Sequence, residues 1–145
     1  MSAMSDYLEN KLVDQIFRGQ AFSFPATLYV ALLTAAPSDT GGGTEVTGGS
    51  YGRQSITGSL ANWAGTQSAG STTASSGTSG TTSNNNVVTF ATPSANWGTV
   101  THFAIYDAST SGALLFWGPL SSSKAVFTGD AVSIQAGQLQ VQMDD

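Results

Sequence analysis

Apolar residues recur with two different periods along this chain. Between residues 6 and 18 they fall at helical spacing, which predicts one amphipathic helix within residues 5–19. The apolar residues of this stripe are Leu8, Leu12, Val13, Ile16 and Phe17. Asp6 and Glu9 suit the first turn as a capping box, and Gly19 supplies the residue that stops the helix. A short helix is marginally stable alone in water, so we expect the stripe to pack on another surface.

From Pro25 onward apolar and polar residues alternate, which is the spacing of β-strands. The first such segment, Thr27–Leu33, is apolar on both faces, as in a strand buried between two layers. Seven more short segments follow: Tyr51–Thr57, Val87–Phe90, Val100–Tyr106, Ala113–Trp117, Lys124–Thr128, Ala131–Gln135 and Gln138–Met143. Gly129-Asp130 and Ala136-Gly137 are placed to join the last three by tight turns. About eight short antiparallel strands with one N-terminal amphipathic helix predict a mainly β fold, a β-sandwich or jelly-roll-like domain.

Residues 64–86 differ in composition from the rest of the chain. They contain Gly, Ser, Thr, Ala, Asn and a single Gln, without a charged or aromatic side chain. Such a tract buries too little apolar area to offset an ordering cost of about 1–2 kcal/mol per residue. We therefore expect a loop that is mobile in isolation and ordered against a neighbouring subunit. Residues 1–145 then form a single domain, with a β core over 25–63 and 87–143 and this loop between its two parts.

Composition narrows the classes of function. Only 9% of the residues are charged, the formal net charge is −5, and cysteine is absent. The absence of cysteine excludes disulfides and thiol nucleophiles, and the negative charge disfavours nucleic acid as a partner. Because no apolar run is long enough to span a bilayer and no secretory signal is evident, we expect synthesis in a cytoplasm and no membrane partner. An uncharged polar surface is typical of a protein that works by contact with other subunits.

No group of residues indicates a catalytic, metal or cofactor site. His102 is the single histidine, and a lone histidine in a strand is most often a hydrogen-bonded structural residue. Asp107 and Asp130 could form a carboxylate pair for glycoside hydrolysis, but the sequence does not place them together and aspartate is common in turns. The three tryptophans could form a sugar-stacking platform, although core or subunit packing is the more common use of tryptophan. We expect no enzymatic activity and no cofactor.

Several stretches of the chain are distinctive. They are Ser5–Asp14, Phe17-Arg18-Gly19, Pro25–Leu32, Gly42–Val46, Gly49-Ser50-Tyr51, Arg53, Asn96–Phe103 and Ala113–Phe116. Together they resemble a family of small virion proteins of tailed bacteriophages. The resemblance implies a virion component that is either a capsid cement (decoration) protein or a tail-fibre protein. Similar cement proteins are trimeric, so the resemblance also implies a homotrimer and, as partner, the major capsid protein.

We expect the protein to bind the major capsid protein lattice and stabilise the head. The alternative is a tail-fibre or tail-tip protein that contacts the host surface. Small size favours cement, because a fibre usually carries repeats or a coiled-coil shaft and the sequence contains neither. The head surface is therefore the expected location in the virion. The candidate interface residues are Leu8, Leu12, Ile16, Trp63, Gln67, Ser71, Thr78, Asn85, Trp97 and Asp145.

Overall fold

The fold contains one helix and ten strands within residues 2–143, which are the residues described by the computed structural model. In chain order the elements are β1 (Ala3–Met4), α1 (Asp6–Phe17), β2 (Thr27–Ala35), β3 (Thr44–Glu45), β4 (Gln54–Thr57), β5 (Thr81–Ser83), β6 (Val88–Thr89), β7 (Gly98–Tyr106), β8 (Leu114–Val126), β9 (Ser133–Ile134) and β10 (Gln140–Gln142). All strand pairs are antiparallel. The predicted mainly β, sandwich-like domain with one N-terminal helix is confirmed.

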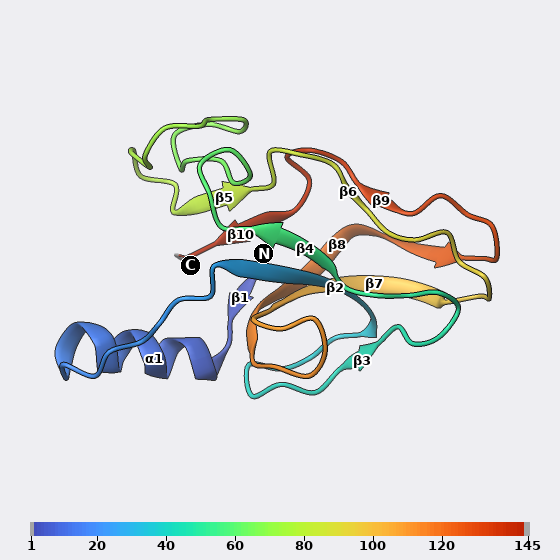
Figure 1. The fold of residues 1–145 in the computed structure, drawn as a ribbon, viewed down its shortest axis with the longest axis horizontal. Coiled ribbons are helices and arrows are strands. Elements are labelled where there is room, and N and C mark those ends of the chain that lie inside the picture. The colour runs from blue at the N-terminus through green and yellow to red at the C-terminus, as the bar shows by residue number, and fades with distance from the viewer. Residues whose placement is uncertain (1, 144–145) are drawn as a thin grey trace.

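The largest sheet has the strand order β1-β8-β7-β2-β3, and β4 also pairs with β2 (Figure 1). Its central strand β2 is buried from Val30 to Leu33. Successive side chains point to opposite faces, so Val30 and Leu32 join the large hydrophobic cluster while Ala31 and Leu33 join a smaller one. Burial on both faces explains why this segment carries an unbroken apolar run.

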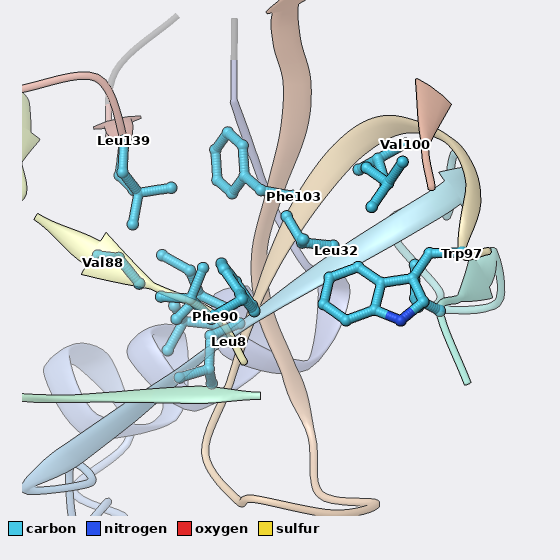
Figure 2. Packing of buried hydrophobic residues seen from close by; sticks show 14 residues of the cluster. Leu8, Leu32, Val88, Phe90, Trp97, Val100, Phe103 and Leu139 are labelled. Carbon is cyan, nitrogen blue, oxygen red and sulfur yellow. The ribbon is translucent and has the colours of Figure 1, made fainter. Parts of the chain in front are cut away.

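Two short ribbons, β5–β10 and β6–β9, pack against the large sheet. Val88, Phe90 and Leu139 from the ribbon side meet Leu32 and Phe103 of the sheet in one cluster (Figure 2). The core therefore lies between the sheet and the ribbons, as in a sandwich whose second layer is made of two separate pieces.

The C-terminal third pairs differently from the prediction. The expected strands Ala113–Trp117 and Lys124–Thr128 are parts of one strand, β8. In it, Leu120–Ser123 bulge out, because Lys124 pairs with Val100 while Pro119 pairs with His102. The predicted hairpins between the last three segments are wrong, since β9 pairs with β6 and β10 pairs with β5. Local turn signals indicate where the chain reverses, but they do not identify the strand that it meets.

Helix α1 begins at Asp6, as predicted, but its N-cap lies one residue earlier than expected. Ser5, not Asp6, is the N-cap, and its hydroxyl accepts a hydrogen bond of 3.3 Å from the backbone N–H of Leu8. Ser5 is almost fully buried and also donates to the carbonyl of Leu114. The cap therefore fastens the start of the helix to β8, and Gly19 ends the helix with a φ of +66°, as predicted.

Candidate interaction surfaces

The N-terminal arm, defined here as residues 5–25, consists of α1 and the segment that returns beside it (Figure 1). The backbone N–H of Phe22 donates to the side chain of Gln15 at 2.6 Å, and the rings of Tyr7 and Phe22 meet edge to face. Phe22 in turn contacts the ring of Phe24, with centroids 4.8 Å apart. These contacts hold the return segment against the helix, so the arm is a structured projection.

Helix α1 packs on the domain through its first half, and Phe22 of the return segment packs against the same core cluster. Leu8 is buried and Leu12 half-buried, but Ile16 is 65% exposed and Phe17 is 78% exposed. Nine large hydrophobic side chains are exposed in the described part of the chain, and five of them belong to the arm. These five are Tyr7, Val13, Ile16, Phe17 and Phe24. A cluster of exposed apolar side chains on one projection is typical of a protein interaction site.

The tract of residues 64–86 makes many hydrogen bonds within the chain, while its mobility in isolation and its contact with a neighbouring subunit stay predictions. Its single glutamine, Gln67, donates to the hydroxyls of Ser71 and Thr73 at 2.6 and 2.8 Å and accepts from the backbone N–H of Ser76 at 3.1 Å. The last part of the tract forms β5, which pairs with β10. In this segment, side-chain hydrogen bonds to nearby backbone and hydroxyl groups take the place of apolar burial.

Asn84 ties the end of the tract to the C-terminal ribbons. It is 1% exposed, and its amide donates to the carbonyls of Asn86 and Gln135 while its oxygen accepts from the N–H of Leu139. The sequence analysis did not single out Asn84, because a buried asparagine cannot be told from a surface one within a run of three.

The predicted interface residues are divided between core and surface. Leu8 and Trp97 are not on the surface, because both are about 95% buried in the large cluster, and the indole N–H of Trp97 donates to the carbonyl of Gly49. Trp63 packs against the same cluster. Leu12, Ser71 and Asn85 are half-buried, while Ile16, Gln67 and Thr78 are exposed. Asp145 lies outside the described residues.

Arg53 forms the main charged cluster inside the domain. Its guanidinium makes two hydrogen bonds to the carboxylate of Glu45 at 2.9 and 2.7 Å and donates to the carbonyls of Ala108 and Ser111. It also lies 3.7 Å above the ring of Tyr106. Burial alone would lower the pKa of Arg53, but the hydrogen bonds and charge of Glu45 outweigh it and the pKa is raised. The cluster holds the β7–β8 connection against β3 and β4.

The residues considered for catalysis have local structural partners. His102 Nδ1 is 2.8 Å from the hydroxyl of Thr101. The carboxylates of Asp107 and Asp130 each accept a backbone N–H bond in a turn, from Ala113 and Phe127 respectively. Within residues 2–143 no three acidic or histidine side chains are grouped as metal ligands would be. No helix in that range has the length and apolar character to cross a membrane.

Two cavities border the β6–β9 ribbon, one along β9 and the other along β6. One, of about 270 Å³, borders the bulge of β8 and includes Leu120, Lys124 and Ile134 in its lining. The other, of about 330 Å³, lies between β4 and β6 and has a mostly polar lining without charged residues. We call the second cavity the β4–β6 slot.

The fold and these surfaces define a mainly β structural domain with a projecting apolar arm. Residues 3–142 match the family described as "Podophage GP4 fiber I protein gp80". The match covers nearly the whole chain, so the protein belongs to this family and is a phage virion protein. The comparison with curated proteins found no match.

Proposed function

We propose that the protein is a tail-fibre subunit that attaches to another virion protein through its N-terminal arm. The observation that carries this proposal is the exposed distal half of α1, with Ile16 and Phe17 mostly in solvent. The family described as a fibre protein supports the tail rather than the head as the location. In this arrangement the arm is the base of attachment and the β domain projects from it.

The energy available at the arm suits such an attachment. Burying a large apolar side chain contributes about 1.5–3 kcal/mol, so covering the exposed parts of Ile16 and Phe17 contributes roughly 2–4 kcal/mol. Val13 and Phe24 enlarge the same surface. The binding free energy from burying one arm is modest, but the total increases when several copies attach to one symmetric assembly.

The family description favours the tail-fibre alternative over the capsid cement hypothesis of the sequence analysis. That hypothesis relied on the small size of the chain and the absence of a shaft. A small domain with an attachment arm needs no shaft of its own, because other fibre proteins can span the distance. Binding to the major capsid protein therefore becomes an outcome that the following experiment tests, and the homotrimeric state stays a prediction.

The test is to locate and count the protein in purified virions. A tagged copy is located by cryo-electron microscopy with a bound antibody fragment, and the copy number is measured by quantitative mass spectrometry. We expect density on the tail and a number of copies set by the tail symmetry. Hundreds of copies on the head would contradict the proposal and restore the cement hypothesis.

A pair of variants tests the role of the arm. Ile16→Asp combined with Phe17→Asp should leave the melting temperature nearly unchanged, because both side chains are exposed, and should remove the protein from assembled virions. Phe127→Asp is the matched control, since Phe127 is 57% exposed outside the arm. Normal incorporation of the arm variant would contradict attachment through the arm.

A further inference from the structure

β4 and β6 belong to different sheets (Figure 1), and the β4–β6 slot is lined by residues of both strands. All four residues of β4, Gln54–Thr57, line one side, and the four consecutive residues 86–89 line the other. β4 pairs only with β2, and β6 pairs only with β9. Each strand therefore has one unpaired edge in the described part of the chain.

The backbone of β4 points free hydrogen-bonding groups into the slot. In an antiparallel pair, residues that bond the partner strand alternate with residues whose N–H and C=O point away from it. The N–H of Gly58 donates to the carbonyl of Ala26 directly opposite, at 2.9 Å. Because Gly58 bonds β2, the alternation makes Ile56 and Gln54 the next residues that bond β2. The backbone N–H and C=O groups of Ser55 and Thr57 therefore point away from β2. Of these groups, only the carbonyl of Thr57 has a side-chain partner, the amide of Asn62.

The backbone of β6 has the same arrangement. The N–H of Phe90 donates to the carbonyl of Val132 opposite, at 2.9 Å. By the same alternation, Val87 and Thr89 direct their N–H and C=O groups away from β9 and toward the slot. On both sides the outward residues are two positions apart, about 7 Å, which is the repeat of an extended strand.

We propose that the slot binds an extended, uncharged peptide segment of another polypeptide, which adds a strand between β4 and β6. The slot contains no charged side chain, so it favours an uncharged segment. Val87, half-exposed at its rim, offers apolar contact to a side chain of that segment. Main-chain hydrogen bonds on both sides would provide the affinity, as in other cases of strand addition.

The open edge of β8 shows why β4 is the better candidate. Beyond its pairing with β1, β8 has Pro119, the bulge Leu120–Ser123 and then Lys124. Proline, bulges and lysine are the features with which proteins prevent strand addition at an exposed edge. β4 has the sequence Gln-Ser-Ile-Thr and a regular register, so its edge has none of these features.

A saccharide fits the slot less well than a peptide. No aromatic ring lines the slot, so a sugar has no stacking surface there. The side-chain amides of Asn62, Asn84 and Asn86 already donate within the chain. The groups left free are mainly backbone groups at strand spacing, which a peptide backbone complements. This inference does not depend on the position of the protein in the virion.

The test is backbone amide exchange measured by NMR on the intact protein. In the free protein, the amides of Ser55, Thr57, Val87 and Thr89 should exchange at least tenfold faster than those of Ile56 and Val88. The probe is the capped, uncharged peptide acetyl-Gln-Thr-Val-Thr-Val-Thr-Gln-amide. Saturating the protein with this peptide should slow exchange at the amides of Ser55, Thr57, Val87 and Thr89 at least tenfold. Exchange at the amides of the β8 edge should stay unchanged.

Two controls make the result decisive. The same peptide with N-methyl groups on both valines keeps its side chains and loses two donors, so it should bind at least tenfold more weakly. Ser55→Pro removes one outward donor of β4 and should also weaken binding, with the melting temperature as a check on folding. Equal binding of both peptides, or outward amides that are already protected in the free protein, would overturn the proposal. So would protection by maltohexaose without protection by the peptide, which would indicate a saccharide site.

Discussion

Removal of the Arg53 guanidinium should destabilise the domain more than any other single loss of charge. Arg53→Met keeps an unbranched apolar stem but leaves the carboxylate of Glu45 and the carbonyls of Ala108 and Ser111 without their donor. The Arg53 side chain is only 7% exposed, so water cannot replace the guanidinium fully. Among the described residues, the hydroxyl of Tyr51, 3.0 Å from Glu45, is then the one side-chain donor left to that carboxylate.

The expected magnitude follows from the burial of the pair. Breaking a fully buried ion pair by removing one partner costs about 3–5 kcal/mol, and because the Glu45 side chain is 24% exposed we expect the lower end, about 3 kcal/mol. For a chain of this length, that corresponds to a fall in melting temperature of roughly 10 °C. Arg18→Met is the matched control, because the pair of Arg18 with Asp14 is exposed and its loss should cost less than about 0.5 kcal/mol.

The assay is urea unfolding followed by tryptophan fluorescence, with the melting temperature from calorimetry. The double variant Arg53→Met with Glu45→Met should recover at least about 1 kcal/mol over Arg53→Met alone, because no unpaired carboxylate then remains. A loss no larger than that of Arg18→Met would refute the reasoning. So would a double variant less stable than Arg53→Met, since it would show that the unpaired carboxylate is not the source of the cost.

Three further predictions concern single side chains. Asn84→Ala should lower the free energy of unfolding by about 2–4 kcal/mol in the same urea assay, because it leaves the N–H of Leu139 and two carbonyls unpaired; a loss under 1 kcal/mol would contradict it. Burial is the main cause that raises the pKa of Tyr51, so the contribution of its neutral hydroxyl to stability should be fully present below pH 10 and be lost at higher pH. The free energy of unfolding should therefore fall less steeply with rising pH in Tyr51→Phe. Urea titrations between pH 8 and 11 test this, and equal slopes would count against it. Gln67→Ala should speed amide exchange throughout residues 66–79 with a change of melting temperature under about 2 °C, and unchanged exchange would show that Gln67 does not order the tract.

Elements whose side chains carry a strong local pattern could be predicted from the sequence. The helical stripe from Leu8 to Phe17 and the two-faced apolar run of β2 correspond to elements of the structure. Partner choice could not be predicted, because it depends on contacts between distant residues. The ribbons β5–β10 and β6–β9 join segments more than 40 residues apart, and a glycine turn between two adjacent segments contains no information about such pairing.

The surfaces could be predicted only where exposure follows from the pattern. The apolar stripe indicates a helix that packs on another surface. It does not show that Leu8 is buried in the core of the domain while Ile16 is exposed to solvent. The slot could not be predicted at all. It depends on which backbone groups remain unpaired after the sheet forms, and backbone groups are the same at every residue.

The shortage of charge has a different physical meaning in the structure than composition alone indicates. Composition alone indicates a coat of uncharged polar residues for contact with other subunits, yet many of these residues bond to one another within the chain. Gln67 and Asn84 each satisfy several backbone or hydroxyl groups that apolar side chains could not. A charged side chain in place of the buried Asn84 would bring a desolvation cost without a counter-charge nearby. The low charge therefore serves the internal order of residues 64–86, while the exposed apolar side chains of the arm and the unpaired edges of β4 and β6 are the features that point to partners.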